Sequence, residues 1–341
     1  MSPHDKAQLA KALARQVGFD LVGVAHPGPS RRAGHYRDWL ARGYHGEMAY
    51  LERTAETRLN PATLLPGVRS IICVGLLYKR TDGYQPLAGR DNRAPVVPTA
   101  ADATARAVGR VAQYARGVDY HVVLHRMLRQ LALRLSAALK DVRWTWRACV
   151  DSAPVLEREL AARAGLGWIG RNTCLLNAGL GSYILLGELL TTLELAEDEP
   201  VTERCARCTR CIDACPTQAL RAPYELDARR CIAYLTIEHR SAIPDELHRL
   251  MGAWVFGCDV CQQVCPFNHS APLGTHPDLI ANLIPPEIPL ESLVTLTSGG
   301  YRRLTRGTAG RRACLSMWRR NAAVAARNAA SRPDAPRTDS A

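Results

Sequence analysis

The stretch that decides how this chain is interpreted is CARCTRCIDACPTQAL, residues 205–220. It places four cysteines at the spacing Cys-x2-Cys-x2-Cys-x3-Cys, with Pro216 directly after the last one. This spacing is typical of iron–sulfur ferredoxins, in which three cysteines hold one four-iron cluster and the fourth ligates a second cluster. A two-cluster interpretation therefore requires four more cysteines, and the chain supplies Cys231, Cys258, Cys261 and Cys265.

The ferredoxin pattern divides these eight cysteines between two 4Fe-4S clusters, because the last cysteine of each run ligates the other cluster. The expected first set is Cys205, Cys208, Cys211 and Cys265. The expected second set is Cys215, Cys258 and Cys261, with Cys231 replacing the ligand that the second run lacks. Zinc sites also use Cys-x2-Cys pairs, but they do not require the whole first run. We therefore predict iron–sulfur clusters rather than zinc.

Composition indicates a globular protein of two or three domains, with 341 residues of which 47% are hydrophobic and 22% charged. The opening residues predict a helix that is capped by Ser2 and ended by Gly18, not an export signal. The apolar stretch 175–195 is interrupted by polar residues and does not predict a membrane span. We expect a cytoplasmic protein, since reduced cysteines suit that compartment. The other four cysteines, expected as small buried or half-buried hydrophobic side chains, are Cys73, Cys149, Cys174 and Cys314.

Short apolar runs alternate with amphipathic helices through the first part of the chain. Strands are expected at 19–25, 70–78, 142–151 and 182–195, and helices at 119–140 and 155–164. This pattern predicts an α/β or α+β domain with a central sheet. The expected divisions are this domain over 1–197, a two-cluster ferredoxin-like module over 198–272, and a helical basic region with a disordered end over 273–341.

The first domain is expected to hold a substrate or a further cofactor, because iron–sulfur clusters only transfer electrons. It contains neither a G-x-G-x-x-G fingerprint after a strand nor a P-loop, so dinucleotide and nucleoside triphosphate sites are not supported. An electron-transfer protein without its own substrate chemistry remains the alternative from another functional class, although such a protein would not need this domain.

Positive charge is concentrated at the C-terminal end. The chain carries a net charge of +12, and residues 301–341 hold ten Arg against two Asp. A basic stripe attracts the phosphates of nucleic acids, and a merely solvated helix is the alternative. Apolar residues among the arginines favour a packed helical segment over 301–328 with one basic face.

The chain resembles the epoxyqueuosine reductases. The resemblance rests on CVDSAPVLERELAARAGLGWIGRNTCLLNAGLGSYILLGELLTTLEL followed by the cysteine run, and it extends to NPATLLPGVRSIICVGLLY, YARGVDYH and GTAGRR…RRNAAVAARN. It implies a reductase that converts epoxyqueuosine to queuosine in the anticodon loop of tRNA, the last step of queuosine biosynthesis. It also implies cobalamin beside the clusters, an external low-potential electron donor and a monomer. A corrinoid reductase of small molecules is the alternative with the same cofactor.

The resemblance implies that Asp151, in the DSAP stretch, is the catalytic proton donor. We expect apolar neighbours such as Val150 and Val155 to hold this carboxyl partly protonated. From the residues alone, a cap of the helix at 155–164 explains Asp151 equally well.

Cobalamin contacts are expected from Arg58, Tyr114, Asp119, His121, Asn172 and Ser182. Glycines at 170, 179 and 181 would let the backbone approach a flat corrin. Asp119 and His121 resemble the start of the Asp-x-His-x-x-Gly motif, but Leu124 occupies the glycine position, so His121 is not expected to ligate cobalt. A helix start at Asp119 and a surface position for Arg58 are the alternatives.

The same resemblance assigns the basic C-terminal region to tRNA. The expected phosphate contacts are Arg306, Arg311, Arg312, Arg319 and Arg320. The modified base would be turned out of the anticodon loop into a pocket.

Overall fold

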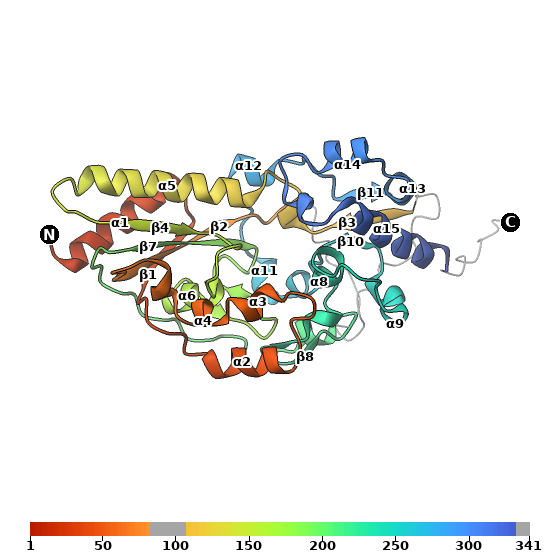
Figure 1. Ribbon diagram of the computed structural model, residues 1–341, viewed down its shortest axis with the longest axis horizontal. Coiled ribbons are helices and arrows are strands. Elements are labelled where there is room, and N and C mark those ends of the chain that lie inside the picture. Colours follow the sequence, from red (N-terminus) through yellow and green to blue (C-terminus); the bar gives the residue numbers. More distant parts are fainter. Residues whose placement is uncertain (82–106, 332–341) are drawn as a thin grey trace.

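A four-stranded sheet forms the centre of the N-terminal part of the computed structural model, which describes residues 1–81 and 107–331 (Figure 1). The strands lie in the order β1 (Leu21–Ala25), β2 (Ser70–Leu77), β7 (Ile184–Thr191) and β4 (Trp146–Cys149). Every neighbouring pair is antiparallel. The predicted central sheet is confirmed, and its antiparallel strands make the fold a mixed α and β structure of the α+β kind.

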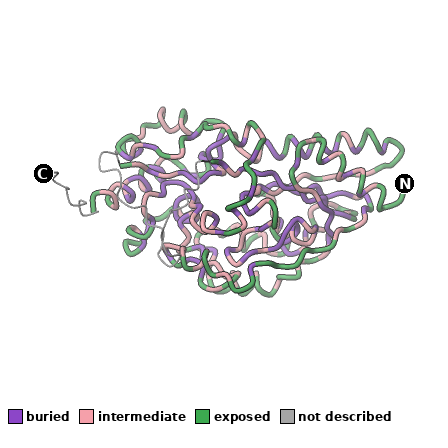
Figure 2. The backbone as a smooth tube through the Cα atoms, turned by 180° about the vertical axis from the view of Figure 1, so that it is seen from behind, coloured by how far each residue is buried: buried purple, intermediate pink, exposed green. Residues whose placement is uncertain are grey.

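The sheet is covered on both faces, which explains why its central strands read as continuous apolar runs. All residues of β2 are buried, and Figure 2 shows the buried strands at the centre of the molecule. Helices α1 (Pro3–Val17) and α5 (Tyr120–Ala138) pack together on one face, and α6 (Glu157–Arg163) packs on the other. The two faces therefore have separate cores.

Both long N-terminal helices follow their sequence signals. The Ser2 side chain accepts a hydrogen bond from the Asp5 amide and completes a capping box, and Gly18 ends α1 with φ 107°. In α5 the buried stripe includes Val123, Met127 and Leu131, as the helical spacing predicts.

Short elements surround the sheet and build the second half of the chain. In the first half they are α2 (Ala33–Ala41), α3 (Tyr50–Arg53), α4 (Ala55–Leu59), η1 (Pro61–Leu64), η3 (Gln113–Ala115), β5 (Trp168–Ile169) and β6 (Leu175–Leu176). In the second half they are α7 (Arg210–Asp213), β8 (Leu220–Ala222), β9 (Glu225–Leu226), η4 (Ala228–Arg230), α8 (Ile232–Ile237), α9 (Asp245–His248), η5 (Arg249–Met251), α10 (Val260–Gln263), α11 (Pro266–His269), α12 (Pro277–Ile280) and α13 (Leu290–Val294).

A second sheet joins all three predicted divisions of the chain. Its central strand is β3 (Val108–Val111), which pairs in parallel with β10 (Trp254–Phe256) and antiparallel with β11 (Glu287–Pro289). The core over this sheet includes Val111, Phe256 and Trp318. Packing thus crosses the boundaries expected at 197 and 272, and the division into three units stays a prediction.

The C-terminal region is a packed helical segment made of α14 (Ser298–Leu304), η6 (Ala309–Arg312) and α15 (Leu315–Ala330). Trp318 and Val324 of α15 are buried in two neighbouring cores. The end expected to be disordered, 332–341, lies outside the described residues. None of the helices described here is both long and apolar enough to cross a bilayer.

Trp318 offers a direct test of the shared core. Its ring is fully buried, stacks on Phe256 at a centroid distance of 5.2 Å, and donates from Nε1 to the Gly310 carbonyl at 3.1 Å. We expect Trp318→Ala to lower the free energy of unfolding by about 3–5 kcal/mol, measured by urea denaturation. The control Val122→Ala removes a side chain that is 59% exposed and should change stability little. Equal effects of both substitutions would contradict the shared core.

Candidate functional site

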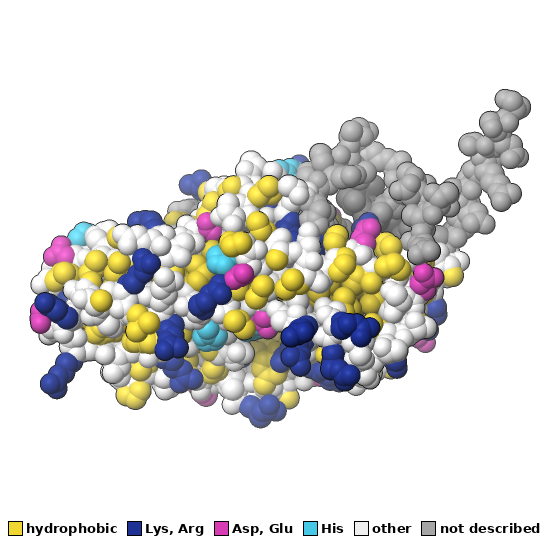
Figure 3. All heavy atoms as spheres, turned by 90° about the horizontal axis from the view of Figure 1, so that it is seen from above, with side chains coloured by type: hydrophobic (Ala, Val, Ile, Leu, Met, Phe, Trp, Pro, Cys, Tyr) yellow, Lys and Arg dark blue, Asp and Glu magenta, His cyan; other side chains and the backbone are white. Residues whose placement is uncertain are grey.

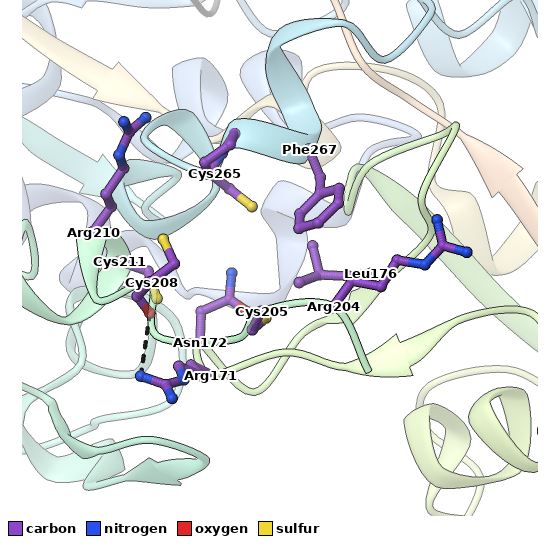
Figure 4. Close-up of a pocket in the computed structure, with 11 residues that line it drawn as sticks. Arg171, Asn172, Leu176, Arg204, Cys205, Cys208, Arg210, Cys211, Cys265 and Phe267 are labelled. Atoms are coloured by element: carbon purple, nitrogen blue, oxygen red, sulfur yellow. Dashed lines mark hydrogen bonds between the residues drawn. The ribbon is translucent and has the colours of Figure 1, made fainter. Parts of the chain in front are cut away.

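Four of the predicted cluster ligands meet at one cavity. Cys205, Cys208, Cys211 and Cys265 all line a cavity of ≈ 240 Å³, with Phe267 and Leu176 on its apolar side (Figure 4). Cys205 and Cys208 lie in the segment before α7, Cys211 lies in α7, and Cys265 directly precedes α11. Among the described residues no three His, Cys, Asp or Glu side chains approach closely enough to hold a single ion. Four thiols around one cavity are the donor set of a four-iron cluster.

The other four predicted ligands form a second group beside the first. Cys215 follows α7, and Cys261 lies in α10, which packs against α7. Cys231 is the N-cap residue of α8, and Cys258 follows β10. Burial raises the pKa of the Cys258 thiol well above its usual value, and the neighbouring Cys231 and Cys215 thiols add to the increase. The structure therefore brings Cys231 to the position that the spacing assigned to it.

A ninth cysteine, Cys174, lies in the second group, and no sequence pattern predicts this position. Its thiol is hydrogen-bonded to the Cys261 thiol. It precedes both cysteine runs and belongs to no Cys-x2-Cys pair. Of the other cysteines expected to be buried or half-buried, Cys73 and Cys149 are buried. Cys314 is exposed, because it precedes the first turn of α15 at the surface.

Asp151 lies in the loop between β4 and α6, with φ 45° in the left-handed region. Its Oδ2 accepts a hydrogen bond from the Tyr120 hydroxyl at 2.8 Å and lies 3.0 Å from His121 Nε2. His121 Nδ1 lies 2.7 Å from Asp119 Oδ1. An imidazole is thus held between two carboxylates, one at each ring nitrogen.

The helix-cap interpretation of Asp151 is wrong. Helix α6 begins at Glu157, its N-cap residue is Leu156, and no side chain caps it. The Asp151 carboxyl points instead to the first turn of α5, where Tyr120 and His121 lie.

The expectation that apolar neighbours keep Asp151 protonated is also wrong. Burial acts to raise the pKa of Asp151, but hydrogen bonds from His121 and Tyr120 outweigh it and hold this pKa below its usual value. Desolvation is the largest single effect on this carboxyl although its side chain is 54% exposed, and the two hydrogen bonds together decide the direction. Burial lowers the pKa of His121, but hydrogen bonds to Asp119 and Asp151 outweigh this effect and raise it to about 9. At neutral pH the proton of this pair therefore rests on His121.

Two further carboxyls lie behind Asp151, and the sequence interpretation missed both. The Asp151 amide donates to Glu157 Oε1, and burial together with the charge of Asp151 raises the pKa of Glu157 to about 7. Glu188 of β7 is 0% exposed. In the sequence, Glu157 does not differ from an ordinary glutamate in the first turn of a helix. Glu188, by contrast, is a lone glutamate inside an apolar strand, and this unusual position could have identified it.

Three predicted cofactor contacts lie around Asp151. Tyr114 packs between Tyr120 and Phe256 at ring distances of 5.9 and 6.3 Å. Asp119 caps α5, which confirms the alternative of a helix start, and its carboxylate also contacts the His121 ring. Its contact with a cofactor stays a prediction. Arg58 is not a surface residue, since it is only 8% exposed and its Nη1 donates to the Val155 carbonyl at 3.2 Å.

The expected corrin contacts in the 170–182 loop are not supported. Ser182 is 4% exposed, and its hydroxyl accepts hydrogen bonds from Gln262 and Asn268 inside the protein. A Cβ at Gly181 would collide with the Asn268 side chain, so this glycine serves internal packing. Asn172 lines the first cysteine cavity, where its Nδ2 is buried without a partner among the described residues.

The basic C-terminal side chains differ in what they contact. Arg306, Arg311 and Arg319 are exposed, and Figure 3 shows Lys and Arg side chains gathered in groups on the face seen from above. Arg312 forms a two-point ion pair with Glu238 at 2.7 and 2.8 Å. Arg320 is committed to internal structure, because it donates to the carbonyls of Leu235, His239 and Ser241. These bonds correct its expected role as a phosphate contact.

Comparison with known proteins gives a consistent assignment. Residues 204–268 match the family described as a 4Fe-4S double cluster binding domain, and residues 58–152 match the family described as epoxyqueuosine reductase QueG, DUF1730. An epoxyqueuosine reductase of Xanthomonas campestris is 41% identical over 96% of this chain and 88% of its own length. The chain belongs to the epoxyqueuosine reductase family. An Escherichia coli member is 39% identical over 96% of this chain and 83% of its own length.

Solved structures of epoxyqueuosine reductases share this fold. A crystal structure with an epoxyqueuosine-modified tRNA-Tyr stem loop has a TM-score of 0.81 and 28% identity, covering 95% of this chain and 82% of that one. The Streptococcus thermophilus enzyme has a TM-score of 0.79 and 26% identity, with the same coverage. The predicted family, its oxidoreductase class and the double-cluster domain are confirmed.

The carboxylate contacts of His121 predict its titration. We expect NMR to give a pKa of about 9 for His121, and Asp151→Asn or Asp119→Asn to lower it towards the ordinary histidine value of 6.5. Because folding raises this pKa, the interaction stabilises the fold fully below about pH 6.5 and is lost as pH rises through about 9. Unchanged titration of His121 in both variants would contradict the network.

Proposed function

We propose that this protein reduces epoxyqueuosine to queuosine in the anticodon loop of tRNA. The observation that carries the proposal is the Asp119–His121–Asp151 network beside two groups of cluster-forming cysteines. Tyr114 connects the two, since it contacts Tyr120 on one side and a Cβ at Gly257 would touch its ring at 3.4 Å. The related structure holding an epoxyqueuosine-modified stem loop supports this substrate.

The reaction defines what the site must supply. Converting an epoxide to an alkene breaks both carbon–oxygen bonds and releases the oxygen as water, which takes two electrons and two protons. An alkoxide is a poor leaving group, so a proton must reach the oxygen as it departs. The clusters suit the supply of electrons, and the carboxyls around Asp151 suit the supply of protons.

Asp151 is the group we propose to face the epoxide oxygen. It has the exposed carboxyl of the network, while His121 behind it keeps a proton at neutral pH. A proton moves from His121 Nε2 to Asp151 Oδ2 across 3.0 Å and from there to the oxygen. The Bacillus subtilis enzyme is described with a catalytic aspartate loop swung out of its active site, and Asp151 likewise lies in a loop.

The residues near Asp151 fit cobalamin in their donor chemistry. The Tyr114 hydroxyl makes no hydrogen bond within the described part of the chain, and Asn60 Oδ1, two residues after Arg58, is buried without a partner there. Such groups suit the peripheral amides of a corrin. We propose Arg58, Tyr114, Asp119 and His121 as its contacts. When bound, cobalamin supplies the low-valent cobalt chemistry at the substrate carbon, while the protein orients the base and delivers protons.

We propose that two 4Fe-4S clusters occupy the two cysteine groups and that an external low-potential donor reduces them. The first group has exposed arginines, Arg204 and Arg210, at its cavity and suits electron entry. The second group lies next to Tyr114 through Gly257 and suits electron delivery to the site. We further propose a monomer that acts in the cytoplasm, where its tRNA substrate is found.

We propose that tRNA phosphates contact the exposed arginines Arg306, Arg311 and Arg319. Arg312 is a further proposed contact to the tRNA, but it lies at a different position from these three arginines. Its charge acts on the pKa of Asp151, so it lies near the site as well as at the surface. A phosphate or ribose of the flipped nucleotide can therefore meet Arg312 while the base faces Asp151.

Removal of the Asp151 carboxyl tests the proposed function. With clusters and cobalamin loaded, Asp151→Asn should lower single-turnover formation of queuosine by about 10²–10⁴-fold, because the proton donor is lost. The measurement is nucleoside mass spectrometry of epoxyqueuosine-containing tRNA. Asp141→Asn, which removes an exposed carboxyl, is the matched control. Absence of product from the loaded wild-type protein would favour an electron-transfer protein without its own substrate.

The pH profile gives a second test of the same network. The rate should fall as pH rises through about 9, because His121 then loses the proton that it passes to Asp151. In His121→Gln this limb should disappear while a lower rate remains. A limb that persists in His121→Gln would show that another group sets it.

A further inference from the structure

Glu188 is a buried acid with no visible structural purpose. It lies at the middle of β7 with 0% exposure, and neither carboxyl oxygen has a hydrogen-bond partner among the described residues. Most buried carboxylates are paired with a cation or with several donors. An unpaired one is stable only when protonated, and burial, followed by the charges of Glu157 and Asp151, raises the pKa of Glu188 well above its usual value.

The sheet register places Glu188 close to the site. It stands opposite Cys73 of β2 and Cys149 of β4, both fully buried, and α6 covers this face. The chain runs from Cys149 through one residue to Asp151. Glu188 therefore lies beneath the strand end that carries Asp151.

Glu157 contacts the Asp151 loop and lies near enough to Glu188 for its charge to raise the pKa of that acid. It is the first residue of α6, and its Oε1 accepts the Asp151 amide hydrogen. Its second oxygen makes no hydrogen bond with any described residue. By contrast, Glu159 on the same helix is occupied by the Ser30 hydroxyl and the Arg31 amide. Both carboxyl oxygens of Glu159 are thus occupied by structural hydrogen bonds, whereas one oxygen of Glu157 is not.

We propose that Glu157 and Glu188 form a proton store behind Asp151 that supplies the second proton of the reduction. The inference rests on the proposed function, because that reaction consumes two protons while the His121–Asp151 pair holds only one at neutral pH. After Asp151 has protonated the opening epoxide, an O–H bond of Glu157 breaks and one forms on Asp151. Glu188 then passes its proton to Glu157, and water refills the store after turnover.

The surrounding charges favour a stored proton on this pair. The titratable and charged groups that face it are Asp151 of the loop, His121 of α5, Arg147 and Cys149 of β4, Cys73 of β2, and Arg158 and Arg163 of α6. Asp151 favours protonation of Glu157, whereas Arg158 and His121 oppose it, and the pKa of Glu157 comes to about 7. Such a group can give up its proton and recover it near neutral pH.

Infrared spectroscopy tests the store without any turnover. The full-chain protein carrying its clusters should show a protonated-carboxyl band that persists above neutral pH and is lost in Glu188→Gln. A second such band should titrate at about pH 7 and be lost in Glu157→Gln. Glu159→Gln should leave both bands unchanged. Absence of both bands from the wild-type protein would overturn the proposal.

Single-turnover kinetics tests the delivery of the proton. Glutamine at 157 still accepts the Asp151 amide hydrogen but carries no acidic proton, so Glu157→Gln should slow queuosine formation about tenfold or more and enlarge the solvent deuterium isotope effect. Glu188→Gln should show a smaller loss, and Glu159→Gln none. Equal rates and isotope effects for Glu157→Gln and the wild type would overturn the proposal. Both bands present in a protein that never forms queuosine would instead uphold the store and refute the proposed function.

Discussion

The pairing of β2 with β7 is the constraint on which the site depends. It runs without interruption from Ser70 opposite Thr191 to Leu77 opposite Ile184, and β2 is buried along its whole length. β7 in turn aligns β4, whose end carries Asp151. A slip by one residue would move the Glu188 side chain to the α1–α5 face of the sheet, away from α6. The hydrophobic burial that fixes this register therefore also fixes the positions of the acids.

The second sheet connects the segment that carries Tyr114 and His121 to the segment that carries Cys258. β3 pairs with β10 through Val111 and Phe256. Beyond Val111 the chain leads to Tyr114 and then to the helix of His121, and beyond Phe256 it leads to Cys258. Two short segments that leave one strand pair thus place Cys258 and the proposed proton carriers at neighbouring positions. This shared origin explains why the chain interlocks across the boundaries that composition suggested.

Local patterns in the sequence predicted much of this structure. Cysteine spacing selected the eight thiols that the structure brings together, and the helix caps at Ser2 and Gly18 follow from backbone hydrogen bonding alone. What escaped depends on contacts between distant segments. Nothing near Asp151 in the chain reveals His121 at 3.0 Å, so an apolar environment was expected where the structure has a charged one. The roles of Ser182 and Arg320 were missed for the same reason, because their partners lie about eighty residues away.

In the proposed reaction the charges of the electrons and of the protons are coupled. Each electron that arrives at the cysteine groups adds negative charge near Asp259, which already affects the pKa of Tyr114 together with Asp151. Added negative charge favours the protonated forms of nearby carboxyls. Reduction of the clusters should therefore raise the proton affinity of Asp151 and Glu157. A site that is loaded with electrons is for this reason also loaded with protons, and a two-electron, two-proton reduction needs both to be present when the epoxide opens.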